Sequence, residues 1–174
     1  SASEIEHPEL KGAYAAHDIG HIYLNDVYFG NIPKLEASLK HSVETGFHPK
    51  GCDTSESVIV HELGHLLFDG MSMRGDEKFD EIMDAISDAQ KSGDLEKVSK
   101  YALNTQGNGE YSETASEIFA SMFYTPENEQ ADVTKKVKQI LFKNTNSNNS
   151  HQKSNESYLS NVTDFIKFNY RCEE

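Results

Sequence analysis

Apolar residues recur at intervals of three and four along most of the chain, which is the spacing of a helix with one buried face. This pattern predicts helices over residues 33–40, 54–68, 77–91, 94–103, 110–124 and 132–143. Segment 21–29 is instead rich in β-branched and aromatic residues between Gly20 and Gly30, which predicts a strand. The expected fold class is therefore α+β and mostly helical.

The domain organisation follows from where this pattern begins and stops. Residues 1–20 are polar and are expected to be irregular or partly helical. Residues 21–143 carry the periodic segments and form the predicted domain, since a chain of 174 residues is long enough for one core. Residues 144–156 are rich in Asn and Ser, which predicts a flexible loop, and 157–174 carry apolar residues that predict a C-terminal segment docking on the domain.

The helix predicted over 54–68 contains the sequence His-Glu-Leu-Gly-His, from His61 to His65. Residues four apart share a helix face, so both imidazoles can bind one metal ion, and Glu62 can reach a water beside it. Two imidazoles and a carboxylate at this spacing are typical of zinc hydrolases. The alternative is a chance match, which ordinary residue frequencies produce in roughly one sequence per few hundred.

The surroundings of the motif favour a zinc site over a chance match. Asp53 is predicted to cap the helix, with Thr54 as the competing cap, and Asp69-Gly70 is predicted to end it. Apolar residues cover the faces away from the histidines, so the helix is expected to be buried nearly all round, where unpaired polar groups are costly. Gly64 costs about 1 kcal/mol of helix propensity relative to Ala, which predicts close approach of another segment near the metal.

A catalytic zinc ion needs a third protein ligand and an open position. A third histidine at metzincin spacing would fall on Met71, so a downstream acid is expected instead. The helix predicted over 110–124 places Glu113 and Glu117 on one face. We expect Glu113 to bind zinc and Glu117 to orient a ligand histidine through its second ring nitrogen. The reverse assignment and two solvated glutamates are the alternatives.

The two motifs together resemble the gluzincin family of zinc metallopeptidases. The lead-in over 45–54, Thr-Gly-Phe-His-Pro-Lys-Gly-Cys-Asp-Thr, resembles the metallopeptidase domains of phage head-morphogenesis and mobile-element proteins. Segment 98–103 and the acidic helix also resemble the catalytic domain of anthrax lethal factor. The resemblance covers roughly residues 21–127. It implies a zincin-like fold, with an edge strand near 21–29 over the active-site helix 54–68 and a second metal-binding helix at 110–124.

The resemblance also implies roles for single residues. It implies a Zn²⁺ ion with three ligands, His61, His65 and Glu113. Glu62 would act as general base, taking a proton from the attacking water and passing it to the leaving amine. Tyr101 would stabilise the oxyanion. Segment 104–110 is longer than the resemblance leads us to expect, which makes Tyr111 the rival of Tyr101.

Charge and composition limit the classes of partner that the chain is expected to bind. Acidic residues outnumber basic ones, 29 to 16, for a formal net charge of -13, which argues against nucleic-acid binding through phosphates. No apolar stretch approaches the length of a membrane span, and no signal peptide is visible in this chain. The expected partner is a protein or peptide substrate in extended conformation that pairs with strand 21–29, although an ordinary core strand fits that segment equally well.

The remaining histidines and cysteines suggest little chemistry. His48 lies in the lead-in loop and is interpreted as structural in preference to a substrate contact. His17, His21 and His41 have no partner at ligand spacing. The cysteines Cys52 and Cys172 are far apart in the sequence, and neither is needed as a zinc ligand.

The sequence therefore favours a zinc-dependent endopeptidase. It is expected to be soluble, and either cytoplasmic or virion-associated, or a secreted toxin or effector. One alternative is a catalytically weak or inactive metallopeptidase-like structural or binding module of a phage or mobile-element protein, although such a module would need neither Glu62 nor the acidic helix. A zinc hydrolase acting on a non-peptide bond is another, because the metal chemistry is shared. The sequence leaves the oligomeric state open.

Overall fold

The computed structural model describes residues 2–18, 20–107, 109 and 111–143. The predictions for 144–156 and 157–174 lie outside these residues. The chain divides into two compact units, Ser1–Leu141 and Phe142–Glu174, and the first contains the site described below. Within the described part of the chain, no helix is both long and apolar enough to span a membrane.

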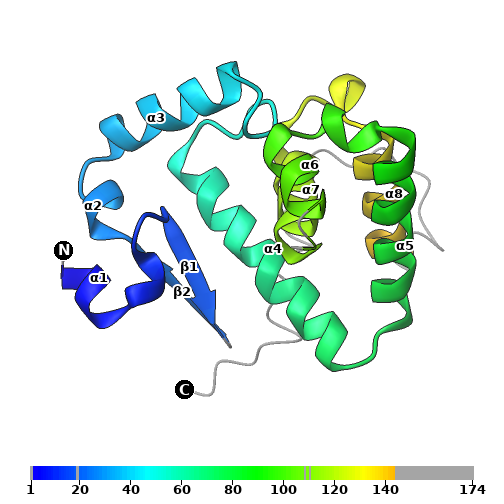
Figure 1. The fold of residues 1–174 in the computed structure, drawn as a ribbon, viewed down its shortest axis with the longest axis horizontal. Coiled ribbons are helices and arrows are strands. Elements are labelled where there is room, and N and C mark those ends of the chain that lie inside the picture. Colours follow the sequence, from blue (N-terminus) through cyan, green and yellow to red (C-terminus); the bar gives the residue numbers. More distant parts are fainter. Residues whose placement is uncertain (1, 19, 108, 110, 144–174) are drawn as a thin grey trace. The chain divides into compact units, whose positions relative to one another are not determined.

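The first unit is mostly helical with one small sheet, which confirms the α+β, mostly helical prediction (Figure 1). Strands β1 (Ala15–Asp18) and β2 (His21–Leu24) form an antiparallel hairpin in which Ala15 pairs with Leu24. The helices are α1 (Ala2–Glu6), η1 (Pro8–Leu10), α2 (Asp26–Phe29), α3 (Ile32–Glu44), α4 (Ser55–Met73), α5 (Glu77–Ser92), η2 (Asp94–Lys97), α6 (Lys100–Gly107), α7 (Tyr111–Tyr124), η3 (Glu127–Glu129) and α8 (Asp132–Phe142).

The predicted strand 21–29 is wrong in its second half, because β2 ends at Leu24 and α2 follows it. Asn25 causes the change: its side chain accepts a hydrogen bond from the Val27 amide and caps α2. The Asn25 amide also donates to the carbonyls of Leu10 and Ala13, so this fully buried side chain ties the start of α2 to the N-terminal segment. That segment, expected to be irregular or partly helical, also supplies strand β1.

Helix α4 carries the His-Glu-Leu-Gly-His motif and lies between the hairpin and α7 (Figure 1). Thr54 caps it by accepting from the Ser57 amide, so Asp53 was the wrong choice of cap. The predicted end at Asp69-Gly70 is also wrong. The helix continues to Met73 because Gly70 and Met71 are buried within it and pack in the core.

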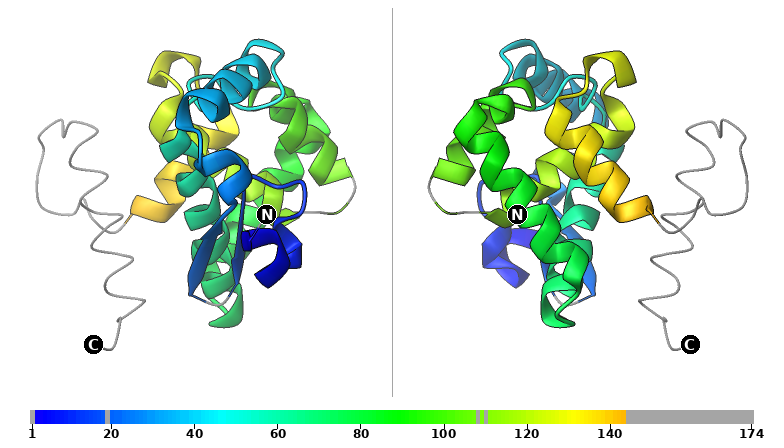
Figure 2. Two further views of the ribbon diagram at one scale, coloured as in Figure 1. Left: turned by 90° about the vertical axis from the view of Figure 1, so that its left-hand side faces the viewer. Right: turned by 90° about the vertical axis from the view of Figure 1, so that its right-hand side faces the viewer.

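Two groups of apolar side chains flank α4. One lies where α4 packs on α7, with the rings of Phe68 and Phe119 edge to face at 6.1 Å, and Ile82 of α5 and Val137 of α8 are buried as well. The other joins β1, α3 and the start of α4 through Ala15, Leu35, Leu39 and Val58. Figure 2 shows α3 and the blue hairpin from two further sides.

The single helix predicted over 94–103 is divided into η2 and α6. Helix α6 begins beside the lead-in loop, where the amide of Lys100 donates to the Gly46 carbonyl at 2.9 Å and that of Tyr101 to the Phe47 carbonyl at 3.1 Å. These two bonds hold the loop that carries His48 next to the helix that carries Tyr101.

Candidate metal centre

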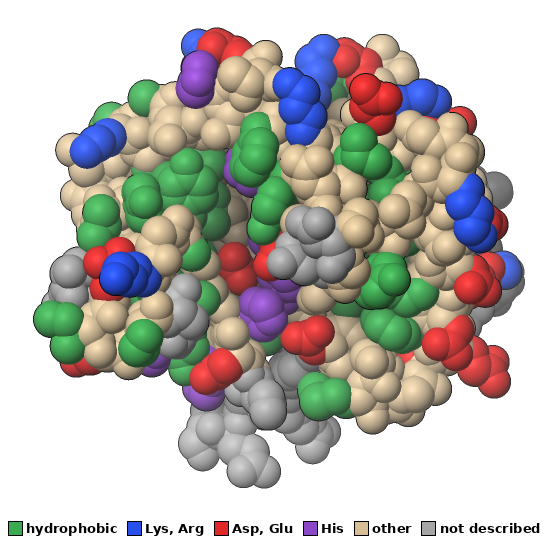
Figure 3. Space-filling model, viewed as in Figure 1, with side chains coloured by type: hydrophobic (Ala, Val, Ile, Leu, Met, Phe, Trp, Pro, Cys, Tyr) green, Lys and Arg blue, Asp and Glu red, His purple; other side chains and the backbone are tan. Residues whose placement is uncertain are grey.

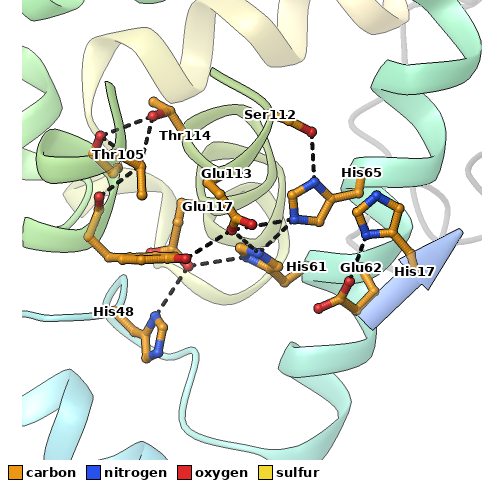
Figure 4. A network of polar contacts seen from close by, with 12 residues as sticks. His17, His48, His61, Glu62, His65, Thr105, Ser112, Glu113, Thr114 and Glu117 are labelled. Atoms are coloured by element: carbon orange, nitrogen blue, oxygen red, sulfur yellow. Dashed lines mark hydrogen bonds and ion pairs between the residues drawn. The ribbon is translucent and has the colours of Figure 1, made fainter. Parts of the chain in front are cut away.

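Three ligand atoms from α4 and α7 converge on one point (Figure 4). Nε2 of His61 lies 3.2 Å from Nε2 of His65 and 3.2 Å from Oε2 of Glu113. Nε2 of His65 lies 3.4 Å from the same Glu113 oxygen. The two histidines share a face of α4 as their spacing predicted, and α7 brings Glu113 to them across the helix pair.

This triangle of atoms has the dimensions of one face of a zinc coordination tetrahedron. Zinc binds His nitrogen and carboxylate oxygen at about 2.0–2.1 Å, so tetrahedral ligand atoms lie about 3.3 Å from one another. The three observed separations, 3.2, 3.2 and 3.4 Å, agree with that value. These three residues therefore fit a zinc ion. An ion held by them would keep its fourth coordination position for water or substrate.

A second group that could hold a metal, His17, Glu62 and His65, fits less well. The rings of His17 and His65 are stacked, with centroids 4.2 Å apart and planes 13° apart. Ring-nitrogen lone pairs lie in the ring plane, so two parallel stacked imidazoles do not direct them to one point. His65 is also held in the first group, because its Nδ1 contacts the Ser112 hydroxyl at 2.7 Å.

Glu117 contacts the ring nitrogen of His61 that does not belong to the triangle, and it is 2% exposed. Its Oε1 lies 3.2 Å from Nδ1 of His61 and 3.2 Å from Nδ1 of His48, and its Oε2 accepts from the Ser99 hydroxyl at 2.7 Å. Burial acts to raise the pKa of Glu117, but the hydrogen bonds from His48 and His61 outweigh it and lower the pKa to about 2. An ionised Glu117 at Nδ1 of His61 leaves Nε2 of that ring free to bind a metal.

Glu113 and Tyr101 are in direct contact. The Tyr101 hydroxyl donates to Oε2 of Glu113 at 3.1 Å, the oxygen that belongs to the triangle. Burial raises the pKa of Glu113, but the hydrogen bonds and charges of His61 and His65 hold it well below its usual range. Tyr111, the rival tyrosine, is 53% exposed at the first turn of α7. Tyr111 lines a second pocket together with Glu113 and Tyr101, but the hydrogen bond to the candidate ligand Glu113 comes from Tyr101.

Glu62 is buried and contacts a residue for which sequence spacing offered no signal. Nδ1 of His17 on β1 lies 3.1 Å from Oε2 of Glu62, and Nε2 of the same ring lies 3.3 Å from Oδ2 of Asp69. The hydrogen bond to Glu62 raises the pKa of His17 against the opposing effect of burial. Because 45 residues separate His17 from Glu62, only the tertiary fold reveals the contact.

A cavity of about 310 Å³ opens next to these residues. Its polar end is formed by His48, His61, Glu62, Tyr101, Glu113 and Glu117, and its other walls are mainly apolar and include Leu39, Phe47, Cys52 and Val58. In Figure 3, histidine and carboxylate side chains lie together in a hollow near the centre of the view, beside apolar side chains. Cys52 is a buried free thiol in this wall, and Cys172 lies outside the described residues.

Comparison of the chain with protein-family models, with curated proteins and with solved structures finds no match. The gluzincin resemblance therefore rests on the sequence motifs alone.

Proposed function

We propose that this chain is a zinc-dependent endopeptidase of the gluzincin type. The observation that carries the proposal is the triangle of His61 Nε2, His65 Nε2 and Glu113 Oε2, whose edges of 3.2–3.4 Å match a tetrahedral zinc site. A structural zinc site would have four protein ligands, whereas this group supplies three and borders a cavity.

Each neighbouring side chain has a place in peptide hydrolysis. Zinc bound by His61, His65 and Glu113 would supply a Lewis acid and lower the pKa of a water molecule to about 7. The carboxylate of Glu62, which lines the same cavity, would take the proton from the attacking water and deliver it to the leaving amine. The Tyr101 hydroxyl would donate a hydrogen bond to the carbonyl oxygen as negative charge develops there.

A peptide substrate is supported by the backbone that borders the cavity. Residues 12–15, which lead into β1, line it, whereas β2 contributes none of its described lining residues. Among the described residues β1 is hydrogen-bonded to β2 alone, so no strand occupies its other edge, and an extended chain is proposed to pair there. The strand proposed to receive substrate is therefore β1 rather than the predicted segment 21–29.

The decisive experiment measures metal and reaction on the same sample. Elemental analysis of the purified chain should give one zinc per molecule, and a peptide library should be cleaved in a chelator-sensitive way. Zinc without cleavage of any peptide would instead support the binding module or a hydrolase for another bond.

The matched variant is Glu62→Gln, which removes the general base but keeps the shape of the side chain. It should retain zinc and folding and lose cleavage by at least about 100-fold. Glu56→Gln, at an exposed position in the first turn of the same helix, is the control and should cleave normally. Full activity in the Glu62 variant would contradict the proposed mechanism.

A further inference from the structure

Two histidines contact the same carboxylate oxygen. Nδ1 of His48 and Nδ1 of His61 each lie 3.2 Å from Oε1 of Glu117. The other oxygen of this group, Oε2, accepts from the Ser99 hydroxyl, and a carboxylate only accepts hydrogen bonds, so both rings donate through Nδ1. In the neutral ring, Nε2 is then a hydrogen-bond acceptor or a ligand. In His61 this nitrogen is one of the three candidate ligand atoms. In His48 it has no partner among the described residues.

The ring of His48 faces the same cavity as the candidate catalytic groups. Its side chain is 17% exposed, and Figure 4 shows its second nitrogen pointing away from Glu117. The ring also contacts Phe47 and Tyr101 edge to face, with centroids 5.0 and 5.8 Å apart. With the loop bonded to the start of α6, the orientation of His48 is set before any ligand arrives.

We propose that His48 is a substrate-binding residue whose Nε2 accepts a hydrogen bond from an N–H group of the bound peptide. Glu117 holds the ring in the tautomer and orientation that this contact requires. The inference rests on the proposed peptidase function and adds to it a specific contact to the substrate. It also gives Glu117 a second task, because one buried carboxylate sets both a metal-facing imidazole and a substrate-facing imidazole.

Two substitutions distinguish the contributions of the two ring nitrogens of His48. In His48→Asn the side-chain amide nitrogen takes the place of Nδ1, so the contact with Glu117 can persist while the cavity-facing group is lost. In His48→Gln the amide lies near the position of Nε2, so a polar group remains at the cavity while the contact with Glu117 is weakened. His41→Asn, at an exposed position of α3, is the control for the histidine-to-asparagine change itself.

Binding is measured with the zinc-loaded chain carrying Glu62→Gln, so that the peptide is not cleaved. The probe is a fluorescein-labelled copy of the library peptide that the wild-type chain cleaves fastest. His48→Asn should raise the Kd of this peptide about 3- to 10-fold, the effect of one lost hydrogen bond, with zinc content and Tm unchanged. His48→Gln should recover most of the peptide affinity while lowering Tm.

Other results would overturn the proposal. Unchanged peptide affinity in His48→Asn, or loss of zinc in that variant, would mean that His48 only supports Glu117. If His48→Asn does not fold, a folded His48→Gln with affinity weakened by more than about 10-fold would likewise exclude the contact. A wild-type chain that holds zinc but cleaves no peptide would refute the proposed function, and this inference with it. Normal wild-type cleavage with an unaffected His48→Asn would refute this inference alone.

Discussion

Gly64 of α4 lies against Ser116 of α7 so closely that a Cβ atom added to Gly64 would be 3.0 Å from Cα of Ser116. It would also lie 3.2 Å from Cβ of Phe119. The sequence predicted such an approach, because a glycine within a buried helix is costly unless another segment needs the space. The segment proves to be the helix that carries Glu113, so Gly64 sets the distance between the helices that hold the candidate ligands.

Gly64→Ala tests this relationship. Alanine should stabilise a helix interior by up to about 1 kcal/mol, but here the added methyl group meets backbone that cannot rotate away. We expect a net loss of about 1–3 kcal/mol in the free energy of unfolding, measured in urea, together with weaker zinc binding. Gly107→Ala in α6 meets nothing within 4 Å and should be neutral or stabilising. A Gly64 variant as stable as the Gly107 variant would show that α7 can move without cost.

The two glutamates of α7 should respond differently to substitution. Glu113→Ala removes a candidate ligand and should leave less than one zinc per molecule after dialysis. Glu117→Ala should still bind one zinc, but about 10- to 100-fold more weakly, because it removes only the group that orients His61. Elemental analysis and competition with a chelator measure the two quantities.

Glu127→Ala, at an exposed position of η3, controls for the loss of one negative charge and should bind zinc as the wild type does. If Glu113→Ala kept a full zinc complement and Glu117→Ala lost it, the two roles would be exchanged.

Local patterns predicted most of the helices. Helix α5 matches its predicted range of 77–91 to within one residue, because Ile82 and Ile86 form a regular buried stripe and Gly93 ends the helix in the left-handed conformation at φ 80°. The pattern misjudged the end of α4, where Gly70 looked like a terminator. A buried glycine inside a helix and a capping glycine look alike in sequence, because the difference lies in tertiary packing.

The sequence predicts the parts of the candidate site whose residues share one helix face. It does not predict the contacts between segments that are far apart in the chain. His61, Glu62 and His65 follow from spacing on α4, and the Glu113 and Glu117 pair follows from spacing on α7. The contacts of His17 and His48 with these helices join segments far apart in the chain, so no periodicity marks them. The roles of all these residues remain predictions until zinc and cleavage are measured.

The choice between the two tyrosines is testable by removing single hydroxyls. Tyr101→Phe should lower kcat by about 100-fold or more with little change in zinc content, because its hydroxyl lies at the metal triangle and is proposed to stabilise the oxyanion. Tyr111→Phe should be close to wild type, since that side chain is half exposed. Steady-state kinetics on the best library peptide measure both. The reverse pattern would restore Tyr111 as the oxyanion residue.

Zinc affinity should rise with pH because His61 must lose a proton to bind a metal. Burial opposes the charge on His61, but the carboxylates of Glu113 and Glu117 outweigh it and raise its pKa from 6.5 to about 10. Without zinc, the proton on His61 stabilises the fold fully below pH 6.5, and this contribution is lost as pH rises through about 10. Zinc competes with the same proton, so its apparent Kd should fall about tenfold per pH unit between pH 7 and 9.

Chelator competition at several pH values measures this slope, and calorimetry in buffers of different ionisation enthalpy should show about one proton released per zinc bound at pH 8. Glu117→Gln removes one of the three carboxylates that raise the pKa of His61, so the slope of this variant should flatten at a lower pH. A zinc affinity independent of pH between 7.5 and 9 in the wild type would mean that His61 is already neutral there. In that case Glu113 and Glu117 would not hold a proton on the ring in the zinc-free chain.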